Sequence, residues 1–139
     1  WSPVYKSDIR KIEAVQRRFT KRLKYCSHLS YAERLNYLKN ETLELRRLKQ
    51  DLITIFKVLN NLLNVNFSEF FEFNTYGTNR GHSLKLVKPN SKNNAREFSF
   101  ACRRVSCWNS LPDCAVNAQT IGIFKCSINS IDFSKYLIF

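Results

Sequence analysis

Apolar residues recur at helical spacing near the start of the chain. With 100° of rotation per residue, Ile9, Val15, Phe19 and Leu23 all fall within about 60° of Ile12. This pattern predicts an amphipathic helix over residues 9–26, and the apolar stripe is narrow enough to be the face that packs on a core.

The opposite face of the same predicted helix is almost wholly cationic. Between Arg17 and Lys24, five of eight residues are basic and none is acidic. Such a density of like charge repels itself unless anions lie along it, so we expect phosphate contacts here and keep a merely solvated face as the alternative. The expected contacts are Arg17, Arg18, Lys21, Arg22 and Lys24.

Two further helices follow in the first half of the chain. Ser30 with Glu33 forms an S-x-x-E capping box that predicts a short helix. A longer helix is expected over residues 42–64, and Phe56 and Leu63 widen its apolar seam to a stripe, which favours packing on the first helix over a free coiled coil. The seam is Leu45, Leu48, Leu52, Ile55, Leu59 and Leu62.

The second half has a more irregular pattern. Aromatic residues crowd residues 67–76, and the Gly- and Asn-containing stretch that follows predicts a hinge between lobes. Residues 83–88 alternate like a strand, residues 97–108 suit a strand or a short helix, and Thr120 is expected to cap a final helix over residues 121–131. The predicted fold is mainly α, with a basic three-helix lobe (residues 1–66) and a smaller lobe of short strand or irregular segments and a final helix (residues 67–139).

Composition narrows the possible functions. The chain has 139 residues, 44% of them apolar, and 23 Lys plus Arg against 11 Asp plus Glu, a formal charge of +12. This balance favours a polyanionic partner. The chain has only three glycines, and they are not spaced as in a phosphate-binding glycine loop.

No apolar run is long enough for a membrane span and no signal peptide opens the chain, so we expect a nuclear or cytoplasmic location rather than secretion. A chain that begins with Trp1 and has no Met is expected to be a piece of a longer polypeptide.

A second basic set lies in the second lobe, where it is interleaved with aromatic residues. Phosphate neutralisation and base stacking are both open to such a mixture, although we expect Trp108 to be a core residue. The basic members of this candidate site are Arg80, Lys85, Arg103 and Arg104.

Catalytic and metal chemistry find little support in the sequence. No two acidic residues are adjacent, and Glu69 and Glu72 lack a His or Lys to complete a site. We therefore expect no catalytic residue, cofactor or small-molecule substrate. The five cysteines are odd in number and have no secretory context, so we expect free thiols rather than disulfides. Their spacing matches no zinc motif, and a zinc site remains an open alternative for Cys102, Cys107, Cys114 and Cys126.

Seven motifs resemble, in order and spacing, the segment that follows the catalytic palm in jockey-like non-LTR (LINE) retrotransposon reverse transcriptases. The resemblance spans about residues 1–126. The motifs are Trp1-Ser2-Pro3; Ile12-Glu13-Ala14-Val15-Gln16-Arg17-Arg18-Phe19-Thr20-Lys21; Tyr31-Ala32-Glu33-Arg34-Leu35; Thr42-Leu43-Glu44 with Arg46-Arg47 and Asp51-Leu52; Arg80-Gly81-His82 with Lys85-Leu86; Trp108-Asn109-Ser110-Leu111-Pro112; and Phe124-Lys125.

The resemblance implies a thumb and C-terminal region of an RNA-directed DNA polymerase that acts in target-primed reverse transcription. The palm and the endonuclease would lie upstream, so this chain would bind nucleic acid without catalysing a reaction. The first helix would grip a template–primer duplex, the second lobe would contact element RNA or target DNA, and the upstream palm would be a protein partner. The alternatives are a protein-interaction module that packs on the palm or on a second copy, and an inert relic of a retrotransposon reading frame.

Overall fold

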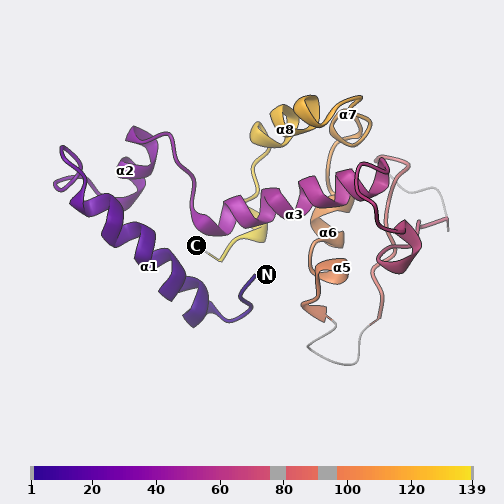
Figure 1. Cartoon of the computed structure of the whole chain (residues 1–139), viewed down its shortest axis with the longest axis horizontal. Coiled ribbons are helices and arrows are strands. Elements are labelled where there is room, and N and C mark those ends of the chain that lie inside the picture. The colour runs from indigo at the N-terminus through magenta and orange to yellow at the C-terminus, as the bar shows by residue number, and fades with distance from the viewer. Residues whose placement is uncertain (1, 76–80, 91–96, 139) are drawn as a thin grey trace. The chain divides into compact units, whose positions relative to one another are not determined.

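The computed structural model describes residues 2–75, 81–90 and 97–138, and it confirms the mainly helical fold. Figure 1 labels the helices along the chain. The residues form two compact units. The first unit comprises Trp1–Leu48 and Phe133–Phe139, and the second unit comprises Lys49–Asp132. The division therefore falls at a different point from the expected boundary between residues 66 and 67.

The first unit is built on helices α1, Lys6–Arg22, and α2, Tyr31–Tyr37, which pack on one another. The capping box predicted for α2 is present: the Ser30 hydroxyl accepts from the Glu33 N–H, and the Glu33 carboxylate accepts from the Ser30 N–H at 2.7 Å. These bonds lower the pKa of Glu33. A single turn of 3-10 helix, η2, Ser134–Tyr136, joins this unit from the far end of the sequence.

Helix α3, Leu43–Leu59, is shorter than predicted. The chain leaves the helical conformation at Asn61, which has a φ of 55°, and Leu62 is 55% exposed rather than buried in the seam. Asparagine adopts the left-handed region more readily than most residues, so it provides a C-terminal stop that the leucine spacing did not reveal.

The second unit has its core around the later part of α3 and helix α8, Ile121–Asn129, where the Phe56 and Phe124 rings stack with centroids 4.4 Å apart. Thr120 caps α8 by accepting from the Ile123 N–H, as predicted. Trp108 lies fully buried in this core, in agreement with the sequence expectation.

Three short helices supply the rest of the second unit's helical structure. They are α5, Phe100–Arg103, α6, Val105–Asn109, and α7, Asp113–Val116. The first two resolve the choice left open for residues 97–108 in favour of helix.

The strand predicted over residues 83–88 is reduced, within the described residues, to an isolated antiparallel bridge between Phe73 and Leu86. On its other edge Leu86 meets a side chain instead of a strand: Asn109 Oδ1 accepts from the Leu86 N–H at 2.9 Å, and Asn109 Nδ2 donates to the Leu86 carbonyl at 2.8 Å. The amide satisfies both backbone groups, so no further strand is needed there.

The predicted hinge covers residues 74–82, of which residues 76–80 lie outside the described residues, and the aromatic cluster before it is part of the second unit. It contains the 3-10 turn η1, Phe67–Glu69, and the Phe67 and Phe73 rings stack at 4.5 Å. Phe71 is buried and packs edge-on against Phe100 at 5.8 Å. The crowding of phenylalanines therefore marks packing rather than a boundary.

Candidate nucleic-acid interface

Helix α1 turns a different face to the core from the one its apolar pattern predicts. The buried positions are Ile9, Glu13 and Thr20, whereas Val15 is 65% exposed and Phe19 is 64% exposed. Of the predicted apolar stripe, Ile9 is buried as expected and Ile12 and Leu23 are half-buried, whereas the expectation is wrong at Val15 and Phe19.

The hydrogen bonds of Glu13 explain how a carboxylate can lie on the buried face of α1. Glu13 is 1% exposed, and it accepts from the Tyr31 hydroxyl of α2 and from the N–H of Leu43 at 3.1 Å. Leu43 is the first residue of α3, where backbone N–H groups lack helical partners and favour a negative charge. Burial, together with the bond to Glu13 and the charge of Glu13, raises the pKa of Tyr31 and keeps the phenol a donor.

Arg34 makes the second buried polar junction of the first unit. It is 5% exposed; its Nε donates to Thr20 Oγ1 at 3.1 Å, its Nη1 to the Leu29 carbonyl at 2.5 Å, and its Nη2 to the Arg17 carbonyl at 3.5 Å. Its guanidinium also lies 5.6 Å from the centre of the Tyr31 ring. These bonds tie α2 and the preceding loop to the last turn of α1.

The five cations predicted to contact phosphate are all exposed in this arrangement. Four of them occupy the last two turns of α1, and Lys24 follows directly. The Arg17 guanidinium lies over the Tyr31 ring at 4.7 Å, which holds its position at one edge of the set. We call Arg17, Arg18, Lys21, Arg22 and Lys24 the α1 cation cluster.

No acidic residue interrupts this cluster in the sequence, and Glu41 meets α1 just before it, where its backbone carbonyl accepts from Gln16 Nε2 at 3.1 Å. The sequence has no acidic residue from residue 14 to residue 32, and the neighbouring Glu13 is buried beneath the helix. Glu33, the next acid, is engaged in its capping box. The cluster therefore presents a positive potential that no neighbouring carboxylate in the sequence interrupts.

Arg103 and Arg104 of the second basic set are held by a carboxylate. Arg103 makes a bidentate pair with Asp51, with contacts of 2.7 Å and 3.0 Å, and Arg104 Nε donates to the same carboxylate at 3.0 Å. The two arginine side chains are 16% and 15% exposed. Both guanidinium groups are therefore oriented by Asp51 and largely withdrawn from the surface, although one carboxylate balances only one of the two charges.

The remaining two members of the second set are Lys85 and Arg80. Lys85 is partly buried, and its carbonyl accepts from the Asn74 N–H at 2.8 Å. Arg80 lies outside the described residues. Within the first unit, the structure thus brings the cations of α1 together on one exposed stretch.

His82 has a structural place in the second unit. It is 1% exposed; Nε2 donates to the Trp108 carbonyl at 3.1 Å, and Nδ1 is buried with no hydrogen-bond partner among the described residues. Burial lowers the pKa of His82 despite that bond, so the ring is neutral at physiological pH. Trp108 Nε1 in turn donates to the Leu84 carbonyl at 2.9 Å, which fixes this segment against α6.

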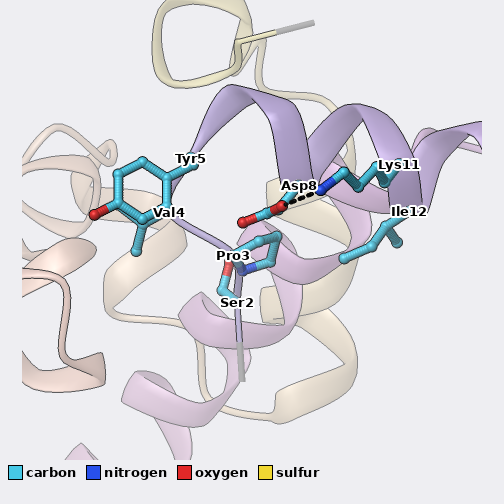
Figure 2. A pocket seen from close by; sticks show the side chains of 7 residues that line it. All are labelled: Ser2, Pro3, Val4, Tyr5, Asp8, Lys11 and Ile12. Atoms are coloured by element: carbon cyan, nitrogen blue, oxygen red, sulfur yellow. Dashed lines mark hydrogen bonds and ion pairs between the residues drawn. The ribbon is translucent and has the colours of Figure 1, made fainter.

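A shallow hollow of about 430 Å³ lies at the start of α1 (Figure 2). Residues 2–5 form one side of it and the Asp8–Lys11 ion pair, at 3.1 Å, closes the other. Its one carboxylate is neutralised by that pair, so the hollow offers no catalytic constellation.

Metal binding by the cysteines gains no geometric support. Among the described residues, no group of three or more His, Cys, Asp or Glu side chains is placed to hold a metal ion. Cys102 and Cys107 are buried, Cys114 and Cys126 are exposed, and all are free thiols. Burial raises the pKa of Cys107 to about 12, as expected for a thiol that serves as a small apolar core residue.

Sequence reasoning missed the residues that position the cation cluster, namely Glu13, Thr20, Tyr31 and Arg34. One signal was available, because Glu13 is the sole acid between Asp8 and Glu33 in a strongly basic stretch. A lone carboxylate among cations is a candidate for a buried, paired role.

Comparisons with protein-family models, with curated proteins and with solved structures find no match for this chain. In the part of the chain that the structure describes, no helix is long and apolar enough to cross a membrane.

Proposed function

We propose that this chain binds nucleic acid through the α1 cation cluster, as the thumb and C-terminal region of a non-LTR retrotransposon reverse transcriptase. The region holds template–primer or element RNA for a palm that lies elsewhere in the polypeptide. It catalyses no reaction by itself, and it works in the nucleus or the cytoplasm.

The observation that carries this proposal is the separation of charge in the first unit. Its 13 basic and 5 acidic residues give a net charge of +8. Five of those cations lie exposed within eight residues, while the adjacent acid is withdrawn into the core. Phosphates spaced along a strand are the anions that such a row of cations matches.

The resemblance supports the particular class of protein. Residues of its motifs make the buried bonds that hold the cluster in place: Glu13 and Thr20 in α1, Tyr31 and Arg34 in α2. Further motif residues, Trp108 and Asn109 among them, form the bonds that organise the second unit.

The test is fluorescence anisotropy of the purified chain with an RNA–DNA hybrid, duplex DNA and single strands over a range of salt. We expect the variant R18Q/K21Q/R22Q/K24Q to bind at least about tenfold more weakly, because four phosphate contacts are lost. The slope of log affinity against log salt on duplex DNA should become shallower by about 3.6, at about 0.9 per phosphate. Arg17 is kept because its ring contact with Tyr31 is structural.

A matched control removes the same charge elsewhere. Lys39, Lys88, Lys125 and Lys135 are all exposed, and the variant K39Q/K88Q/K125Q/K135Q should keep its affinity and most of its salt slope. Equal losses in both variants would mean that net charge alone drives binding, and would refute the assignment to α1. Absence of binding to every probe at low salt would refute nucleic-acid binding altogether.

A further inference from the structure

Two aromatic side chains stand exposed beside the α1 cation cluster. Phe19 in the last turns of α1 is 64% exposed, and Tyr25, just after the helix, is 69% exposed. The cluster and both rings fall within residues 17–25, so cations and aromatic faces alternate over nine residues.

The backbone holds Tyr25 in an uncommon conformation. Its φ is 70°, in the left-handed region that bulky residues rarely adopt. The Lys24 ammonium lies 5.5 Å from the centre of its ring. The Cys26 N–H donates to the Leu23 carbonyl at 3.1 Å, so Tyr25 lies at the third position of a tight turn that places Cys26 in the core and leaves the Tyr25 ring outside.

Phe19 is exposed although the same helix buries polar groups. The core face of α1 is filled by Ile9, Glu13 and Thr20, so Phe19 is directed outward by the hydrogen bonds of Glu13 and Thr20 rather than by its own hydrophobicity. At helical spacing its neighbours are Val15 on one side and Arg22 on the other. Val15 and Phe19 therefore form a short apolar strip beside the α1 cation cluster.

We propose that Phe19 and Tyr25 are stacking platforms for unpaired bases, so that the preferred ligand of the α1 cation cluster is single-stranded nucleic acid. This inference rests on the proposed function and specifies its substrate. In a duplex the faces of the bases are covered by their neighbours, whereas a single strand offers both phosphates to the cations and open faces to the rings.

Charge complementarity favours this occupant over a protein. A polypeptide that covered Phe19 would also have to neutralise the adjacent cations with a dense row of acids. Each nucleotide of a single strand brings one phosphate and one aromatic face, which is the combination that this surface displays.

The experiment compares three probes of equal length: an oligothymidine strand, the same strand made of abasic sugar-phosphate units, and duplex DNA. The full chain should bind oligothymidine more tightly than the abasic strand, because the two differ only in the bases. The variant F19L/Y25L should lose about tenfold in affinity for oligothymidine and bind the abasic strand and the duplex as before.

Salt dependence separates the two parts of the surface. F19L/Y25L should weaken binding by the same factor at every salt concentration, whereas loss of cations should change the slope. The control Y37L removes an aromatic residue of α2 that is 63% exposed and should bind all three probes unchanged.

Two outcomes would overturn the inference and leave the proposed function standing. One is equal binding of oligothymidine and the abasic strand. The other is a concentration-dependent mass in sedimentation that F19L abolishes while affinity for oligothymidine persists, which would assign the strip to a second copy of the chain. Failure of the unsubstituted chain to bind any of the three probes at low salt would overturn both proposals together.

Discussion

At the scale of single residues, Glu13 links three elements of the first unit. Its carboxylate accepts from the Tyr31 hydroxyl of α2 and from the N–H of Leu43 at the start of α3, while belonging to α1 itself. A charged acceptor makes these bonds stronger than neutral ones and makes them costly to break.

Removing the Tyr31 hydroxyl should therefore destabilise the chain. We expect Y31F to lower the free energy of unfolding by about 2 kcal/mol, because a buried carboxylate loses one of its donors. Urea denaturation monitored by circular dichroism measures this. The control Y37F, at an exposed tyrosine, should leave stability unchanged, and an equal loss in both variants would contradict the role of the bond.

The same pair has a signature at alkaline pH. Because the pKa of Tyr31 is raised in the folded chain, Tyr31 ionises first in the unfolded state, above its ordinary pKa of 10.0. The unfolded state then binds fewer protons, so stability falls as pH rises beyond that value. The chain should lose stability above pH 10 more steeply than Y31F does.

The sequence predicts the role of a residue well when its hydrogen-bond partner lies a few positions away in the chain. The caps at Ser30 and Thr120 were predictable, because a hydroxyl and the N–H three residues later are neighbours in the chain. The bond from Tyr31 to Glu13 spans 18 residues, and that from Leu43 to Glu13 spans 30. No spacing rule connects such positions, so the buried role of Glu13 required the structure.

At the scale of elements, α6 and residues 82–86 are joined by hydrogen bonds of side chains rather than by a sheet. Asn109 satisfies both backbone groups of Leu86. Trp108 Nε1 donates to the Leu84 carbonyl, and His82 Nε2 donates to the Trp108 carbonyl. The alternating pattern of residues 83–88 predicted a strand, of which the structure retains the bridge at Leu86, because the partner of a strand cannot be inferred from its own alternation.

We expect N109A to be destabilising by about 2 kcal/mol, because the Leu86 N–H and carbonyl would both lose their partner. Thermal unfolding followed by circular dichroism measures the change. The variant N36A alters an exposed asparagine of α2 and should not destabilise the chain. Retention of full stability in N109A would show that water replaces the amide at Leu86.

Helix α1 illustrates why amphipathic patterns can mislead. The apolar stripe predicted the helix itself, because periodicity reports local conformation. It did not predict which face of α1 is buried, because the hydrogen bonds of Glu13 and Thr20 stabilise those two polar residues on the buried face. The five cations of the cluster are nevertheless exposed, as the sequence indicated, because a charged side chain is costly to remove from water.

At the scale of the whole molecule, charge and core are divided between two units. The first unit carries +8, and the second, with 10 basic and 6 acidic residues, carries +4. The expected boundary near residue 66 followed a change in composition. The observed one divides α3 between Leu48 and Lys49, because its later residues pack against Phe124, far along the sequence.

The cysteines allow both units to be monitored at once. Cys114 and Cys126 are exposed, while Cys26 in the first unit and Cys102 and Cys107 in the second are buried. We expect a thiol reagent to label two cysteines rapidly in the native chain and the other three only as the chain opens. Mass spectrometry of the labelled peptides identifies them, and rapid labelling of Cys107 would contradict the described core.

The first unit is discontinuous in sequence, and this has a consequence for synthesis on the ribosome. Glu44 accepts from the N–H of Ile138 at 3.0 Å and 3.2 Å, a contact that closes across 94 residues. The intervening residues, Lys49–Asp132, are an unbroken run that can fold as soon as it emerges. The cationic unit is thus completed only after residues 133–138 are translated, although most of it precedes the second unit in the sequence.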